Sequence, residues 1–150
     1  MIEATRFEMI VVPIDFSKAS RQALELARDL AIEAGPAQVI LVHACFVPVE
    51  IEALVGSAAY EAVEDVDTRA GQELDQLVSE LKDAGVACER VSVRGSPEQV
   101  ILDVAGSKRA DLIVMGTHGR TGLGHLLLGS VAERVVRHAS CPVMTTSIAR

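Results

Sequence analysis

Five short β-rich runs alternate along the chain with four helical patterns, and this alternation constrains the fold more than any other feature of the sequence. The expected strands lie near Glu8–Ile14, Gln38–Cys45, Ala87–Val93, Asp111–Met115 and Pro142–Thr146. Strands that alternate with helices form parallel sheets with right-handed crossovers. The sequence therefore predicts a doubly wound α/β fold, in which helices cover both faces of a five-stranded parallel sheet.

The polarity of each run indicates its place in that sheet. The first, second and fourth runs are continuously apolar, as is typical of central parallel strands that are buried on both faces. The third run alternates apolar and polar residues, and the last is short and ends in Thr145-Thr146. We therefore expect the third and fifth strands to lie at the two edges.

Start and stop signals define the helices between these strands. Ser17 is the expected N-cap of the first helix, which Gly35-Pro36 ends. A second helix is expected at about residues 59–84. Ser96-Pro-Glu-Gln99 and the segment from Ser130 to Glu133 both match the capping box, in which a serine caps the helix and a later Glu or Gln bonds back to it. We expect both serines to be N-caps.

The composition limits the partners that the protein can bind. The chain has 150 residues, enough for one domain over residues 1–150, and aromatic residues make up only 3% of it. This scarcity of aromatic rings and a net charge of −7 argue against nucleic acid and anionic membranes as partners. Residues 116–150 form a net-positive stretch, with four basic side chains and one acidic. An anionic ligand bound there does not have to overcome the charge of the whole chain.

The three cysteines, Cys45, Cys88 and Cys141, lie far apart and in apolar surroundings. Without a Cys-x-x-Cys pair or a cysteine–histidine cluster, they indicate neither a disulfide framework nor a zinc site. We expect buried, reduced thiols. The sequence begins without a secretory signal pattern, and no apolar run approaches the length of about 18 residues that a membrane span needs. These features favour a soluble, cytoplasmic protein.

A glycine-rich segment separates the fourth strand from the last helix, with the spacing Gly116-x2-Gly119-x9-Gly129-Ser130. Backbone N–H groups at a helix N-terminus, reached past residues without Cβ, form an anion site that phosphate commonly fills. The segment contains no lysine, so it is not a Walker A motif, and it does not follow the first strand as the dinucleotide fingerprint does. We expect phosphate to contact the backbone near these glycines, the Ser130 hydroxyl, and Arg120 or His118. The alternative is that Ser130 only caps the helix.

Two more strand ends are expected at the same edge of the sheet, because ligands of open α/β sheets lie outside the carboxyl ends of the strands. Asp15 follows the first strand, and His43-Ala-Cys45 ends the second. The Asp15 carboxylate is suited to accept hydrogen bonds from a ribose or to meet a metal-bound phosphate. The alternative is that Asp15 helps to cap the first helix beside Ser17. The glycine-rich segment favours the ligand role.

Together these motifs resemble the universal stress protein family over essentially the whole chain. The similarity lies in Val12-Pro-Ile-Asp-Phe-Ser17, Leu41-Val-His43, Gly116-Thr-His-Gly119, Gly129-Ser-Val131 and Ser140-Cys-Pro-Val143. The resemblance implies a Rossmann-like, adenine nucleotide alpha hydrolase-like version of the predicted fold. The glycine spacing is similar to that of the family's ATP-binding members.

The resemblance also implies roles for individual residues. Asp15 is implied to contact the ribose, and backbone at Pro13, Ile14 and Ala44 to frame the adenine. The residues implied to line the nucleotide, chiefly at its phosphates, are Met115, Gly116, His118, Gly119, Gly129, Ser130 and Val131. ATP in such sites is commonly accompanied by Mg²⁺ or Mn²⁺, for which Asp15 is the one ligand that the sequence suggests.

A homodimer is implied by the same resemblance, with the last strand, Pro142–Thr146, pairing across a two-fold axis. An edge strand left unpaired is open to unwanted association, which fits this arrangement. Two departures from the family pattern stand out. Thr145-Thr146 is more polar than the usual ending, and Ala132 lacks a hydroxyl that some relatives offer near the phosphates.

The expected role of the nucleotide is sensing. Phosphoryl transfer needs a positioned nucleophile and strong neutralisation of charge, and the sequence assigns neither a second carboxylate nor an arginine to that task. The resemblance implies an ATP-binding stress-response regulator, and the missing groups lead us to expect slow or no hydrolysis; the sequence does not identify its protein partners. The alternatives are a weak ATPase and a dimeric interaction module that needs no nucleotide.

Two segments are expected to respond to the ligand or to lie beside it. Binding is expected to order residues 120–128, which follow the fourth strand. The acidic segment at residues 47–70 is either a surface loop that leads into a helix or a flap over the ligand.

Overall fold

The computed structural model describes residues 6–46, 56–117 and 128–147 of the chain. In these residues the strands are β1 (Met9–Pro13), β2 (Gln38–Cys45), β3 (Ala87–Arg94), β4 (Leu112–Gly116) and β5 (Val143–Thr146). The helices are α1 (Lys18–Ala34), α3 (Gly56–Asp83), α4 (Pro97–Ser107) and α5 (Ser130–His138). Every expected strand and helix is present, within a few residues of its predicted bounds.

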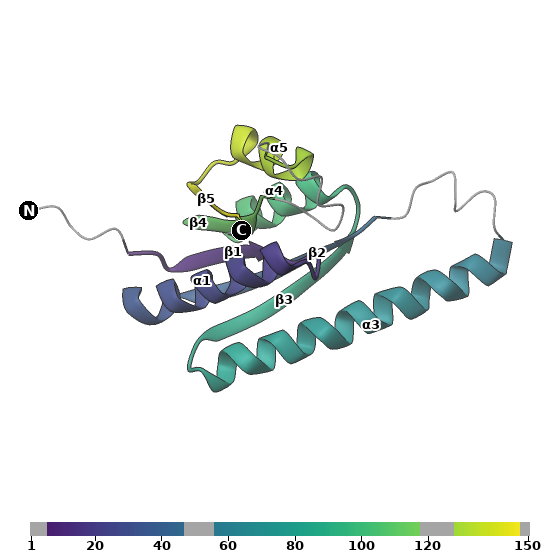
Figure 1. Ribbon diagram of the computed structural model, residues 1–150, viewed down its shortest axis with the longest axis horizontal. Coiled ribbons are helices and arrows are strands. Elements are labelled where there is room, and N and C mark those ends of the chain that lie inside the picture. Colours follow the sequence, from purple (N-terminus) through teal and green to yellow (C-terminus); the bar gives the residue numbers. More distant parts are fainter. Residues whose placement is uncertain (1–5, 47–55, 118–127, 148–150) are drawn as a thin grey trace, which may run out of the picture.

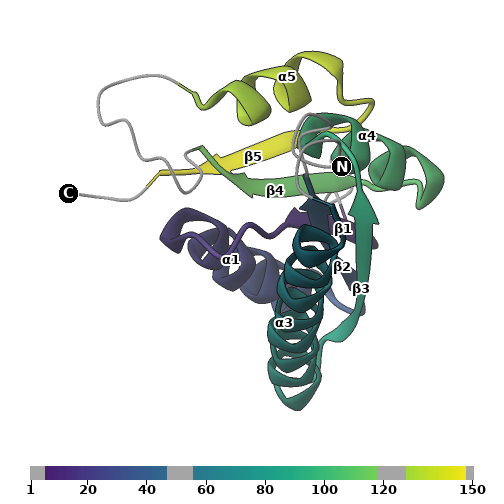
Figure 2. The same cartoon turned by 90° about the vertical axis from the view of Figure 1, so that its right-hand side faces the viewer.

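The five strands form one parallel sheet in the order β3-β2-β1-β4-β5. Helices α1 and α3 cover one face of this sheet, and α4 and α5 cover the other, as Figures 1 and 2 show. This arrangement confirms the doubly wound fold. It also confirms that β3 and β5, the two less apolar runs, are the edge strands.

Two apolar layers hold the helices to the sheet. Along β1, Ile10 and Val12 pack against α1 and α3, whereas Val11 between them packs against α4 and α5. This alternation follows from the pleat of a strand, which points successive side chains to opposite faces. All three side chains are fully buried, which explains why the central runs are apolar without a break.

The strand order reverses between β1 and β4. From β1 the chain moves outward to β2 and β3, and it then returns to add β4 and β5 on the other side of β1. The connections that leave β1 and β4 therefore lead to helices on opposite faces. Such a reversal leaves a crevice at the carboxyl ends of the two strands, where ligands of this fold class bind.

The prediction that serines cap three of the helices is confirmed only in part. Ser17 caps α1 as predicted, since its Oγ accepts a hydrogen bond from a backbone N–H of the first turn at 3.1 Å. Ser96 is the N-cap of α4, but its side chain caps no backbone N–H. At α5 the prediction is wrong: Gly129 is the N-cap and Ser130 is the first helical residue. The Gly129 carbonyl accepts the first helical bond, from the Glu133 N–H at 2.9 Å.

Helix α3 has 28 residues and includes residues 56–70 of the acidic segment. These residues belong to the helix, as the prediction of a helix at about residues 59–84 indicates, whereas residues 47–55, which the sequence leaves as either a loop or a flap, lie outside the described residues. The core contacts of α3 come from Ala70, Leu74, Leu77 and Leu81, in its second half. In the part of the chain that the structure describes, no helix combines the length and apolarity that a membrane crossing requires.

The thiols are all free, but they differ in burial. Cys88 is buried as predicted, whereas Cys45 and Cys141 are partly exposed. The Cys45 Sγ donates a hydrogen bond to the Asp67 carboxylate on α3 at 2.7 Å, and Arg94 of β3 pairs with the same carboxylate at 2.8 Å. This cluster fastens the middle of α3 to the ends of β2 and β3.

Candidate functional site

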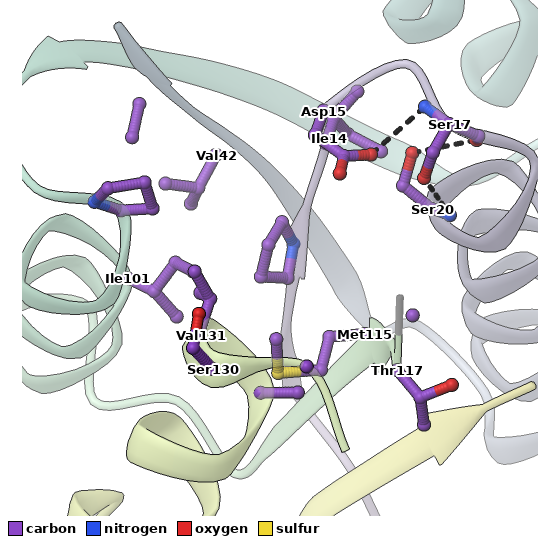
Figure 3. A pocket seen from close by; sticks show the side chains of 16 residues that line it. Ile14, Asp15, Ser17, Ser20, Val42, Ile101, Met115, Thr117, Ser130 and Val131 are labelled. Atoms are coloured by element: carbon purple, nitrogen blue, oxygen red, sulfur yellow. Dashed lines mark hydrogen bonds between the residues drawn. The ribbon is translucent and has the colours of Figure 1, made fainter. Parts of the chain in front are cut away.

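A cavity of about 240 Å³ opens at the carboxyl ends of β1, β2 and β4, where the strand order reverses (Figure 3). Its lining residues are Pro13, Ile14, Asp15, Ser17, Ser20, Val42, Ala44, Pro97, Ile101, Met115, Gly116, Thr117, Gly129, Ser130, Val131 and Ala132. Every predicted site residue that the structure describes is among them: Pro13, Ile14, Asp15, Ala44, Met115, Gly116, Gly129, Ser130 and Val131. The other three predicted residues, His118, Gly119 and Arg120, lie outside the described residues, as does most of the loop at 120–128.

Asp15 sits in a tight turn between β1 and α1. Its Oδ1 accepts a hydrogen bond from the backbone N–H of Ser17 at 2.9 Å, as Figure 3 shows. Asp15 therefore supports the start of α1, which is one of the two roles that the sequence allows for it. This bond occupies one carboxylate oxygen, and the side chain is only partly buried at the cavity wall. The turn role and a ligand role are compatible.

Phe16 gives this turn its shape. Its φ angle is 63°, in the left-handed region that a bulky side chain rarely adopts. Backbone in such regions is found preferentially at functional sites, where surrounding contacts hold it. The Phe16 ring packs against the α1 and α3 layer of the core, while Asp15 before it faces the cavity. The unusual backbone thus places two neighbouring side chains on different sides of the turn.

The N-terminus of α5 forms the opposite wall of the cavity. Its N-cap, Gly129, has no side chain with which to cap it, and the first N–H groups of a helix, here those of Ser130, Val131 and Ala132, have no acceptor within the helix. These groups carry the partial positive charge of the helix dipole, which favours an anion. The Gly129 N–H is held by the Thr117 carbonyl at 2.7 Å, which fixes where the helix starts. Because Ser130 is exposed and is not the cap, its hydroxyl remains suited to a ligand.

Aliphatic side chains supply the remaining surface. Val42 and Ala44 share one face of β2, Met115 ends the buried part of β4, and Ile101 projects from α4. A mostly apolar lining with a few polar groups at its rim is typical of small-molecule sites. The sequence prediction missed Val42 and Ile101. Val42 could have been predicted, because it lies two residues before Ala44 in β2 and so faces the same side of the sheet. Ile101 could not, because only the packing of α4 brings it to the cavity.

Gly116 has a structural explanation that the glycine spacing does not reveal. A Cβ built on it would lie 2.7 Å from the Ala19 Cβ and 2.8 Å from the Ala19 carbonyl carbon. The absence of a side chain therefore allows the first turn of α1 to pack directly on β4. Gly116 lines the cavity through its backbone, and its glycine identity is required by the fold itself.

Near the cavity, the described residues offer few groups that could bind a metal ion directly. Among the described residues no cluster of three or more His, Cys, Asp or Glu side chains is arranged to hold a metal ion. Of the described lining residues, Asp15 alone carries a carboxylate. This donor set fits an ion that arrives with a nucleotide and is bound mainly by phosphate oxygens, as Mg²⁺ usually is.

Comparisons with known proteins identify the family of this chain. The family model described as the Universal stress protein family matches residues 6–147. Universal stress protein MJ0531 of Methanocaldococcus jannaschii is 38% identical over 142 residues, covering 92% of this chain and 81% of the relative. The chain therefore belongs to the universal stress protein family.

Two solved structures of family members are also similar to this structure in their fold. MJ0577, also a universal stress protein of Methanocaldococcus jannaschii, superposes with a TM-score of 0.86 at 29% identity, over 97% of this chain and 99% of that one. A universal stress protein solved in complex with cAMP superposes with a TM-score of 0.66 at 26% identity, over 95% of this chain and 98% of that one. The fold described above is thus the fold of this family.

Proposed function

We propose that this protein binds an adenine nucleotide, with ATP as the first candidate, in the cavity between β1 and α5. The observation that carries the proposal is the convergence of three features on one cavity: the N-terminus of α5, which starts at a glycine cap, the Asp15 carboxylate and an aliphatic slot. Each matches a different part of a nucleotide, namely phosphate, ribose and base. The family member in complex with cAMP supports an adenine nucleotide as the ligand class.

The proposed arrangement assigns each part of the nucleotide to described residues. The N–H groups of Ser130 and Val131, with the Ser130 hydroxyl, would hold phosphate. Asp15 would accept hydrogen bonds from the ribose hydroxyls, as a carboxylate can only accept. The base would lie between Ala44 and Ile101, beside the backbone of β2. An accompanying Mg²⁺ or Mn²⁺ would neutralise phosphate charge, with Asp15 as the available protein ligand.

A sensing role fits this site better than rapid phosphoryl transfer. Catalysts of that reaction neutralise developing charge with Lys, Arg and metal, and orient the nucleophile with a further group. The described lining residues include no lysine or arginine, and Asp15 is their one charged side chain. We therefore propose that binding regulates a stress response and that hydrolysis is slow or absent.

We also propose that the protein works as a homodimer paired through β5, in the cytoplasm. The carbonyls of Pro142 and Thr146 accept hydrogen bonds from the N–H groups of Ile113 in β4 and of Thr117, the residue after β4. Since alternate residues of a strand point their backbone groups to opposite sides, the N–H and C=O groups of Val143 and Thr145 face away from β4. The three free thiols support a reducing compartment.

Calorimetric titration with ATP, ADP, AMP and cAMP, each with and without Mg²⁺, tests the nucleotide proposal. We expect saturable binding of at least one of them, and Gly129→Leu should abolish it by filling the phosphate side of the cavity. Gly129 has a φ of −57°, so leucine is compatible with the backbone there. No heat from any nucleotide at millimolar concentration would instead favour the nucleotide-independent interaction module. Adenine nucleotide released from the purified protein on denaturation would be independent support.

A further inference from the structure

We propose that His43 is a positioning residue for Asp15, which it supports from the opposite side of the β1–α1 turn. The proposal rests on the nucleotide-binding function proposed above and adds a residue that does not line the cavity. The contacts that carry it are a hydrogen bond to the residue before Asp15 and a ring contact to the residue after it.

The position of His43 on β2 directs it away from the ligand. Its neighbours Val42 and Ala44 line the cavity on the α4 and α5 side of the sheet. Side chains alternate along a strand, so His43 projects to the face covered by α1 and α3. Any effect of His43 on a nucleotide must therefore be transmitted through other residues.

The first contact fixes the residue before Asp15. The His43 Nδ1 lies 2.8 Å from the Ile14 carbonyl oxygen. A carbonyl oxygen only accepts, so Nδ1 carries the proton and donates. The Ile14 N–H in turn donates to the Val42 carbonyl at 2.8 Å. Both backbone groups of Ile14 are thus bound to β2, although β1 itself ends at Pro13.

The second contact supports the residue after Asp15. The Phe16 and His43 rings are 5.1 Å apart between centroids, with planes inclined by 51°. Tilted aromatic pairs at this separation attract each other. Phe16 is the residue with the left-handed φ of 63°, a conformation that needs support from its surroundings. His43 therefore braces the turn on both sides of Asp15, which leaves the carboxylate little freedom to move.

A purely structural role for His43 makes a different prediction from a positioning role. If His43 only stabilises the fold, its loss weakens the binding of all nucleotides alike and does so whether or not Asp15 is present. If it positions Asp15, its loss matters only for contacts that Asp15 makes. A double-mutant cycle separates the two cases, because interacting residues give non-additive effects.

The test compares ATP with 2′,3′-dideoxy-ATP, which lacks the ribose hydroxyls, in calorimetric titrations of the full chain without Mg²⁺ or Mn²⁺, so that Asp15 acts on the ribose alone. We expect Asp15→Ala to weaken ATP binding by about tenfold, the loss of one charge-assisted hydrogen bond, and to leave the dideoxy analogue nearly unchanged. His43→Leu should show the same pattern. The double variant should bind ATP no more weakly than Asp15→Ala alone.

Two further variants keep the test independent of the stability of His43→Leu. The amide nitrogen of asparagine can take the place of Nδ1, although the ring contact with Phe16 is lost, so His43→Asn should bind ATP more tightly than His43→Leu. Glutamine places its nitrogen one bond further out, so His43→Gln should behave like His43→Leu. Equal affinities for the Asn and Gln variants would overturn the role of the Nδ1 bond.

The outcomes distinguish this proposal from the one that it rests on. If the unmodified protein binds neither ATP nor the analogue, both proposals fail. If it binds ATP but the losses from His43→Leu and Asp15→Ala add, or if His43→Leu weakens the dideoxy analogue equally, the positioning role alone is wrong.

Discussion

The backbone carbonyl of Thr146 accepts two hydrogen bonds from Thr117, one from its N–H at 2.9 Å and one from its hydroxyl at 3.1 Å. The Thr117 carbonyl accepts a third bond, from the N–H of Gly129 at 2.7 Å. Thr117 thus joins the end of the edge strand β5 to the first turn of α5. The proposed dimer strand and the proposed phosphate side of the cavity share this one buried residue.

The two serines at helix starts should respond differently to removal of their hydroxyls. Ser17→Ala should lower the free energy of unfolding by about 1 kcal/mol, because Ser17 caps α1. Ser130→Ala should change it by less than about 0.5 kcal/mol, because Ser130 is helical and exposed, and it should weaken nucleotide binding instead. Urea denaturation and calorimetry measure the two quantities. A large loss of stability in Ser130→Ala would mean that this hydroxyl caps the helix after all.

Gly116→Ala should destabilise the fold whether or not a ligand is present. The new methyl group would collide with the backbone of Ala19, and we expect a loss of about 1–3 kcal/mol. Gly106→Ala is the matched control, since a Cβ there meets nothing within 4 Å. Replacing this glycine inside α4 should stabilise the protein by about 0.5–1 kcal/mol. Chemical denaturation decides, and equal effects at the two glycines would contradict the close packing of α1 on β4.

The Cys45 thiol should be unreactive until Asp67 is neutralised. Burial, and then the hydrogen bond and charge of Asp67, raise the pKa of Cys45 to about 11 against the opposing effect of Arg94. Asp67→Asn removes a negative charge beside the thiol, so its pKa should fall and its alkylation by iodoacetamide at pH 8 should accelerate by about threefold or more. Burial raises the pKa of Cys88 to about 11 independently of Asp67, which makes it an internal control in mass spectrometry. An unchanged rate at Cys45 would show that burial alone suppresses it.

Acid should weaken the attachment of α3. The hydrogen bond from Cys45, with the pairing to Arg94, lowers the pKa of Asp67 in the folded protein, and Arg90 lowers the pKa of Asp75. Because these values lie below those of the unfolded chain, the carboxylates stabilise the fold above about pH 4, and this contribution disappears as the pH falls through the folded values. The free energy of unfolding, measured in urea between pH 6 and pH 3, should therefore fall less in Asp67→Asn than in the unmodified protein. Parallel curves would exclude Asp67 as a source of acid sensitivity.

Thr145→Pro should separate the proposed dimer from the fold of the monomer. The Thr145 backbone faces away from β4, so proline removes an outward N–H group without breaking a bond within the sheet. Sedimentation at micromolar concentration should show monomers, with unchanged circular dichroism. Thr145→Val, which keeps the N–H group, should remain dimeric. If the proline variant also sediments as a dimer, the interface lies elsewhere.

Much of the fold could be predicted because it depends on pattern. The centre of β2, Val39–Val42, is buried and apolar on both faces of the sheet, and this run of apolar residues can be recognised directly in the sequence. The meeting of Asp15 with the start of α5 could also be predicted, since the carboxyl ends of parallel strands share one edge. Ile101 could not, because its place in the cavity depends on how α4 packs.

The N-cap of α5 and the left-handed conformation of Phe16 could not be predicted, because the residue types at these positions are compatible with more than one backbone geometry. Both Gly129 and Ser130 are good N-caps, and the hydrogen bond from Gly129 to Thr117 decides between them. Nothing in the sequence signals a left-handed phenylalanine, because its conformation is supported by His43, which lies 27 residues away along the chain.

The two edge strands of the sheet differ in charge, which limits how many copies of the chain can join by strand pairing. Along β3, Arg90 and Arg94 are ion-paired to α3 and Glu89 to Lys108, so charged side chains guard that edge. The short β5, with the sequence Val-Met-Thr-Thr, carries no charged side chain. A sheet that can be extended at one edge alone accepts a single neighbour and then has nowhere further to grow. Strand pairing between copies of this chain should therefore stop at two, and the same charges that anchor α3 protect the protein from polymerising into fibres.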